Sequence, residues 1–145
     1  MMTEGLGRLY NVHYPADDDY VSLVDAGGVT FFGYEDGTTS ACTVTFAADA
    51  AGTGAVTPDS IDHFYGRAVD QSDGVWHKTA VSPASETFGK SATTEDLVAI
   101  EILASQCPDG KPYVKCAIAG SGIVFAVLHD LKYGHAPQNL RSVIA

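Results

Sequence analysis

Histidine and aspartate side chains are the first candidates for chemistry in this 145-residue sequence. His63 and His77 could bind a metal ion across a hairpin, or meet Asp62 or Asp73 in the pocket of a small β-barrel enzyme. A zinc site needs further Cys, His or carboxylate ligands, and none stands at a telling spacing. The remaining histidines are scattered along the chain, at His13, His129 and His135. The sequence therefore predicts neither a metal site nor a histidine-centred triad.

Two short motifs resemble parts of ion and phosphate sites. Asp17-Asp18-Asp19 supplies carboxylates, but a helix-loop-helix calcium site needs them at alternate positions, with a glycine and a later Glu. Gly89-Lys90-Ser91 matches the end of a phosphate-binding loop, but Ala84 stands where that loop needs its first glycine. We therefore expect an acidic surface turn at 17–19, and no bound cofactor.

The net charge of −10, with eight Lys and Arg in the whole chain, limits the kinds of partner. Nucleic acids and anionic membranes are bound through clusters of basic residues, which this sequence lacks. The acidity favours solubility, and a cationic partner surface or a salt-rich medium is the alternative explanation. The sequence therefore predicts no nucleic-acid and no membrane partner.

We expect no secretory signal, no membrane span and no disulfide bond in this chain. Residues 1–10 are short, mixed and glycine-rich, unlike a secretory signal. The longest apolar run, Ile123 to Leu128, is six residues, which is too short to span a bilayer. Three cysteines, Cys42, Cys107 and Cys116, are an odd number without metal-ligand spacing, so we expect reduced thiols.

Composition indicates an all-β domain. The chain is 46% hydrophobic and contains 15 glycines, with frequent Thr and Val and few residues that favour helices. We predict a mainly antiparallel, compact β-sandwich or barrel-like domain over residues 1–145. Residues 1–7 form a flexible N-terminal arm, 8–134 the β body, and 135–145 an extended C-terminal tail.

Alternating apolar residues predict most of the strands. In the first half, an antiparallel meander of strands is the simplest interpretation, at 8–14, 20–24, 29–34 and 40–46. In the second half, 63–69 and 75–81 read as a hairpin around the polar loop 70–74. Trp76, the only tryptophan, is expected to anchor the core.

A second hairpin is predicted between 97 and 118. Two alternating sets point inward, namely Val98, Ile100 and Ile102 in the first run, and Val114, Cys116 and Ile118 in the second. Pro108-Asp109-Gly110 suits a three-residue loop with Gly110 left-handed, which pairs Cys107 with Lys111 and Ile102 with Cys116. This register keeps Cys107 and Cys116 apart, so we expect no disulfide between them.

The apolar run from Ile123 to Leu128 has two possible structures. Apolar residues at consecutive positions are typical of a central strand that is covered on both faces. The alternative is a helix capped by Ser121 and ended by Gly134.

A tract of small residues interrupts the chain after the strand that ends at Phe46. Residues 47–55 are Ala, Asp, Gly and Thr only, so they contain no side chain large enough to build a core. We expect the tract to connect the two β halves and to offer a contact surface at Ala50, Gly52 and Gly54.

The order of these features resembles the small virion proteins of tailed bacteriophages and prophages. The resemblance extends over residues 40–145. It rests on the Thr/Val strand that leads into the small-residue tract, the hairpin containing Phe64-Tyr65 and Trp76, the Val/Ile strand at 97–103, and the last apolar strand, which precedes Tyr133 and a proline-containing tail.

The resemblance implies a capsid decoration, or cement, protein without enzymatic activity. Such a protein is made in the host cytoplasm and binds the shell of the major capsid protein on the virion surface. It is expected to form a symmetric homo-oligomer such as a trimer. The arm, the small-residue tract and the tail would make the contacts, through Ala50, Gly52, Gly54, Pro137 and Leu140.

Three further functional classes remain open. One is the small β-barrel enzyme, which requires Asp62 or Asp73 to converge with His63 or His77 in a pocket. A phage tail, fibre or head-tail component would show the same general order and composition of segments. A carbohydrate-binding β-sandwich would need exposed, coplanar aromatic rings, for which Tyr10, Tyr14, Tyr20 and Trp76 are the candidates.

Overall fold

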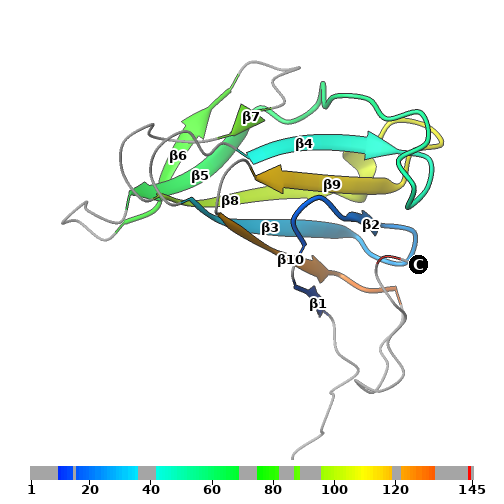
Figure 1. Ribbon diagram of the computed structural model, residues 1–145, viewed down its shortest axis with the longest axis horizontal. Helices are drawn as coiled ribbons and strands as arrows, with labels where there is room; N and C mark the ends of the chain where they lie inside the picture. Colours follow the sequence, from blue (N-terminus) through cyan, green and yellow to red (C-terminus); the bar gives the residue numbers. More distant parts are fainter. Residues whose placement is uncertain are drawn as a thin grey trace, which may run out of the picture.

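Ten strands pair into two antiparallel sheets in the part of the chain that the computed structural model describes, residues 10–14, 16–35, 42–68, 75–81, 87–88, 96–118, 122–132 and 144 (Figure 1). The six-stranded sheet has the order β1 (Tyr10–His13), β10 (Ile123–His129), β3 (Gly28–Glu35), β8 (Asp96–Leu103), β5 (His63–Ala68) and β6 (His77–Ala80). The four-stranded sheet has the order β2 (Tyr20–Ser22), β9 (Tyr113–Ile118), β4 (Cys42–Ala47) and β7 (Thr87–Phe88). A single 3₁₀ turn, η1 (Ala104–Gln106), follows β8.

The two sheets pack face to face around one core, with β4 and β9 alongside β8 and β3 (Figure 1). Phe31 of β3 and Phe46 of β4 are fully buried in it, one from each sheet. The approach is close at Gly33, where an added Cβ would lie 2.8 Å from Cys42 Sγ of the other sheet. The predicted all-β sandwich is therefore confirmed.

The alternating patterns predicted which side chains point inward. The inward sets of β8 and β9 are all buried, namely Val98, Ile100, Ile102, Val114, Cys116 and Ile118. The predicted hairpin of the second half is also confirmed, because β5 and β6 pair antiparallel with His63 opposite Ala80. The acidic turn is confirmed in that Asp17 and Asp18 are exposed and Asp18 lies in a turn.

The predicted meander is wrong, because consecutive strands alternate between the sheets. β2 pairs with β9, β3 pairs with β8 and β10, and β4 pairs with β9 and β7. The connection between β2 and β3 crosses the core, and its Leu23 and Ala26 are buried. Strands that are consecutive in sequence are usually neighbours in a sheet, but a short loop can also cross from one sheet of a sandwich to the other.

The predicted hairpin between 97 and 118 is also wrong. Ile102 of β8 pairs with Val29, and Cys116 of β9 pairs with Val44, so the two strands belong to different sheets. The predicted left-handed Gly110 is confirmed, at φ +74, but the predicted three-residue loop is not: Lys111 N–H donates to Pro108 C=O at 3.0 Å, so the turn is centred on Asp109 and Gly110. Because η1 precedes this turn, the connection is long enough to cross between the sheets. No disulfide joins Cys107 to Cys116.

Two expectations for apolar residues are corrected. The run Ile123 to Leu128 is strand β10 and not a helix, but it is covered on one face only, because Ile123 and Phe125 are exposed. Trp76 is 40% exposed and does not anchor the core. Local hydrophobicity predicted burial at these positions, but burial depends on whether a second layer lies above them.

Several expectations concern residues outside the described part of the chain. These are the arm at 1–7, the loop 70–74, the segment 89–91, and the tail positions Pro137 and Leu140.

Candidate interaction surfaces

The small-residue tract folds into a loop that closes on its own strand. Phe46 N–H donates to Val56 C=O at 2.9 Å, and Val56 N–H donates back to Phe46 C=O at 2.8 Å. Inside this pair, Ala48 N–H donates to Thr53 C=O at 3.0 Å. The segment 46–56, called here the closed loop, lies between β4 of one sheet and β5 of the other. The sequence predicted a connection between the two β halves of the chain at this place.

Asp49 organises the closed loop from within. Its Oδ1 accepts hydrogen bonds from the backbone N–H groups of Ala51 and Thr53, each at 3.0 Å. Hydrogen bonds from the Thr53 side chain, and then from this backbone, hold the pKa of Asp49 below its usual value. The carboxylate is therefore charged at neutral pH and acts as a structural acceptor.

The predicted contact positions have different roles in the closed loop. Ala50 and Gly54 are exposed, whereas Gly52 is half-buried with φ +82. A Cβ at Gly52 would lie 2.8 Å from the Tyr20 ring, and Gly54 C=O accepts a hydrogen bond from Lys111 Nζ. Ala50 is thus available to a partner, while Gly52 is required by the fold of the loop.

A second surface was missed by sequence reasoning. The face of the six-stranded sheet that points away from the core, called here the outer face, carries eight exposed large apolar side chains. They are Tyr10, Val12, Tyr14, Phe32, Tyr65, Leu103, Ile123 and Phe125. The outward positions of an antiparallel sandwich are usually polar, so an apolar outer face is unusual.

Strand register places these side chains in rows. Phe125 pairs with Phe32, Phe32 with Ala99, Ala99 with Tyr65, and Tyr65 with Lys78, so one row crosses five strands. Tyr14, the residue after β1, extends the row at its other end, because its ring stacks on Phe125 with centroids 4.5 Å apart and planes 21° apart. The sequence signal for this face was present in β10, where apolar residues occupy both the inward and the outward positions.

The four aromatic candidates for a sugar platform do not come together. Tyr10 and Tyr14 lie on the outer face, but Tyr20 lies on the four-stranded sheet, where its hydroxyl shares a 3.1 Å hydrogen bond with Thr45 Oγ1. One face of the Tyr14 ring is covered by Phe125. Trp76 precedes β6, at the opposite edge of the sheet from Tyr10. These rings therefore form no single coplanar platform.

The histidines proposed as ligands lie on different faces of the β5–β6 pair. His63 is opposite Ala80, whereas His77 is opposite Gly66, a position of the other parity on β5. His63 Nδ1 forms a 2.5 Å contact with Asp62 Oδ1, and this hydrogen bond lowers the pKa of Asp62. Asp73 lies outside the described residues. No group of three metal-ligating side chains is found among the residues that the structure describes.

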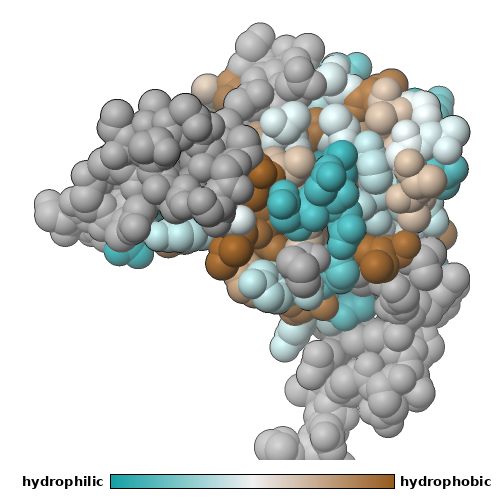
Figure 2. Space-filling view, viewed as in Figure 1, coloured by the Kyte–Doolittle hydropathy of each residue, from teal (hydrophilic) through white to brown (hydrophobic). Residues whose placement is uncertain are grey.

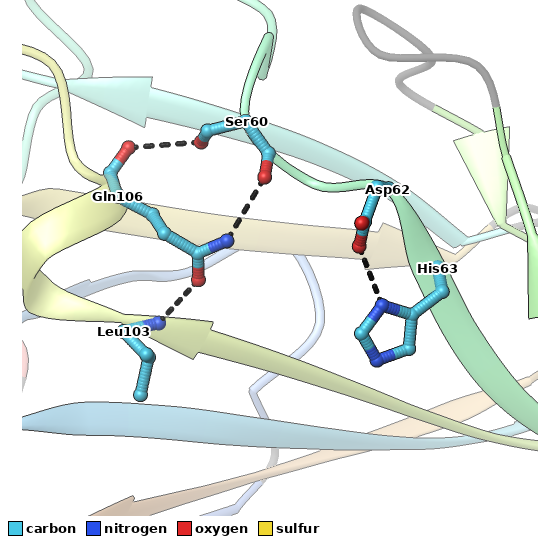
Figure 3. A network of polar contacts seen from close by, with 5 residues as sticks. All are labelled: Ser60, Asp62, His63, Leu103 and Gln106. Atoms are coloured by element: carbon cyan, nitrogen blue, oxygen red, sulfur yellow. Dashed lines mark hydrogen bonds and ion pairs between the residues drawn. The ribbon is translucent and has the colours of Figure 1, made fainter.

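Figure 3 shows that the Asp62–His63 pair stands apart from a neighbouring polar clamp. In the clamp, Ser60 Oγ donates to Gln106 C=O at 3.0 Å, and Gln106 Nε2 donates to Ser60 C=O at 2.9 Å. Gln106 Oε1 also accepts from Leu103 N–H at 2.8 Å. Because the Ser60 hydroxyl is directed to Gln106, it is not placed as a nucleophile beside His63.

The four-stranded sheet presents a more polar surface. Lys115 Nζ lies 2.6 Å from Asp18 Oδ1, and this hydrogen bond raises the pKa of Lys115. The same Nζ lies 5.1 Å from the centre of the Tyr20 ring. Hydrophilic residues gather in the middle of the view in Figure 2, where Figure 1 places β2 and β9. The apolar outer face thus contrasts with the opposite side of the sandwich.

Comparisons with models of protein families, with curated proteins and with solved structures find no match to this chain. The described residues also include no helix of the length and apolarity that a membrane crossing requires. The closed loop and the outer face are therefore interpreted from their own geometry.

Proposed function

We propose that this protein is a non-enzymatic structural component of a phage virion, a capsid decoration protein that binds the shell of the major capsid protein. The proposal rests on the resemblance over residues 40–145. The structural observation that supports it is the closed loop, which presents small side chains on a rigid backbone.

A closed loop of this kind suits a repeated protein surface. Small side chains let a partner approach the backbone closely, and the loop is already ordered by its own hydrogen bonds. A preordered loop loses little conformational entropy when it binds. We assign the shell contact to Ala50 and Gly54 of this loop, together with Pro137 and Leu140 of the tail. Many copies on one shell would add avidity to individually weak contacts.

Binding to shells tests the proposal. Shells assembled from the major capsid protein of the same genome are mixed with the purified protein and sedimented, and the bound fraction is measured. Ala50→Glu places a charge on an exposed position that does not have positive φ, so it should weaken shell binding by at least about tenfold, which is roughly 1.4 kcal/mol. Tm should stay close to that of the unchanged protein.

Val75→Glu is the matched control. Val75 is also exposed, but it precedes β6, far from the end of β4 and the closed loop (Figure 1). Wild-type protein that fails to sediment with shells would reject the proposed function. Equal binding by Ala50→Glu and Val75→Glu would remove the closed loop from the contact. Heating decorated and bare shells then tests the cement role by measuring the temperature at which each kind of shell disassembles. Equal temperatures would reject that role.

A further inference from the structure

The outer face differs from the rest of the molecule in charge as well as in hydropathy. The chain contains 18 Asp and Glu residues, yet Glu101 is the only one at the outward positions of the six described strands. Arg67 and Lys78 are the basic residues at those positions. The other acidic residues that the structure describes as exposed, such as Asp17, Asp18 and Asp109, lie outside these positions.

The aromatic side chains of the outer face supply about half of the area that a stable interface takes from each partner. Its five exposed aromatic side chains are each between 37% and 53% exposed. At roughly 200 Å² for each side chain, they leave on the order of 400 Å² uncovered. Val12, Leu103 and Ile123 and the half-exposed residues between them enlarge this area. A stable interface takes about 800 Å² from each partner, and a monomer seldom exposes an apolar patch above roughly 600 Å².

We propose that a second copy of this chain covers the outer face, in a two-fold, face-to-face dimer of sandwiches. A two-fold interface joins the same patch on both copies. Two chains of charge −10 repel each other, and on the outer face the described strands carry a single outward acidic residue, Glu101. Sheets stacked in this way lie about 10 Å apart, which suits rows of interdigitating aromatic side chains.

The few charges on the outer face fit a self-complementary contact. Glu101 lies on β8, and Arg67 and Lys78 lie on β5 and β6 towards one edge. A two-fold rotation can bring the acidic group of each copy towards the basic groups of the other.

The dimer leaves the closed loop accessible. The loop packs against Tyr20 of β2, which belongs to the four-stranded sheet, whereas the dimer uses the six-stranded sheet. The inference is therefore independent of the proposed virion role, and both surfaces can be occupied together.

Light scattering coupled to gel filtration tests the dimer with the full chain alone. We expect twice the monomer mass, with dissociation on dilution. Phe125→Lys should raise the Kd of the dimer at least about tenfold, because it buries a charge at the centre of the aromatic row. Tyr65→Lys tests the same row from β5. Val24→Lys is the control, since Val24 is 47% exposed, against 38% for Phe125, but lies in the β2–β3 connection. Circular dichroism shows that each variant is folded.

Each result has a definite meaning. A monomer or a trimer at all concentrations overturns the inference, as does a folded Phe125→Lys variant that dimerises as tightly as wild type. If the protein is monomeric but binds shells, and Phe125→Lys abolishes that binding, the capsid protein covers the outer face and the dimer is rejected. A dimer that binds no shells supports this inference and rejects the proposed virion function instead.

Discussion

Two glycines with positive φ are required by the structure for different reasons. Gly52 and Gly110 both have positive φ, at +82 and +74. A Cβ at Gly110 would meet nothing within 4 Å, whereas a Cβ at Gly52 would collide with the Tyr20 ring. A glycine is thus needed at position 110 only because the backbone has positive φ there. At position 52 it is needed for the positive φ and also because a side chain would collide with the Tyr20 ring. A glutamate at Gly52 would disturb the loop itself, so Ala50 is the better position for probing contacts.

Gly52→Ala should therefore destabilise the protein more than Gly110→Ala. The left-handed conformation alone should cost Gly110→Ala about 1 to 2 kcal/mol in the free energy of unfolding. Displacing the Tyr20 ring, and with it the Tyr20–Thr45 hydrogen bond, should cost Gly52→Ala a further ~1 to 3 kcal/mol. Urea unfolding measures both values. Equal losses would show that the ring moves aside freely.

At the scale of elements, the Ser60–Gln106 clamp fastens two connections to each other. Ser60 lies in the segment before β5, and Gln106 lies in η1 after β8. Since β5 and β8 pair in the same sheet, the clamp holds the ends of neighbouring strands in place. Gln106 serves three backbone or hydroxyl partners, so the clamp depends more on Gln106 than on Ser60.

Gln106→Ala should consequently destabilise the protein more than Ser60→Ala. The first substitution leaves Leu103 N–H and Ser60 C=O without their partners, which should lower the free energy of unfolding by about 1 to 3 kcal/mol. The second substitution removes only the hydrogen bond of the Ser60 hydroxyl, which should lower the free energy of unfolding by about 0.5 to 1.5 kcal/mol. Chemical denaturation of the two variants checks the order. A reversed order would mean that the side-chain amide contributes little.

At the scale of the whole molecule, the two sheets share one core. Phe31 from the six-stranded sheet and Phe46 from the four-stranded sheet are fully buried in the same cluster. Neither sheet could bury its apolar face alone, because each is covered by the other. The single domain expected over residues 1–145 should therefore unfold as one unit.

Phe31→Ala and Phe46→Ala test this cooperativity. Each should lower the free energy of unfolding by about 3 to 5 kcal/mol and leave a single transition. Fluorescence of Trp76 reports on the edge near β6, and circular dichroism reports on both sheets. Coincident curves from the two probes are expected for both variants. Separate transitions in Phe46→Ala would show that the six-stranded sheet folds independently.

Which side of each strand is buried could largely be predicted from the sequence, but which strands pair could not. The alternation of Val98, Ile100 and Ile102 correctly indicates their common face. The same alternation suits any antiparallel neighbour, so it did not distinguish β9 from the true partners of β8, which are β3 and β5. The left-handed Gly110 was predictable because φ is a local property, whereas the crossing of its loop between sheets is not.

The amino-acid sequence by itself determined the all-β class, the inward sets of side chains, the β5–β6 hairpin and the small-residue connection, because each depends on neighbours along the chain. Only the tertiary structure decided that Phe125 and Trp76 are exposed, that His63 and His77 face opposite ways, and that the tract closes on Phe46. Exposure and proximity depend on the arrangement of distant strands. The sequence of an apolar strand does not show whether a second layer of the same chain or a second molecule covers it.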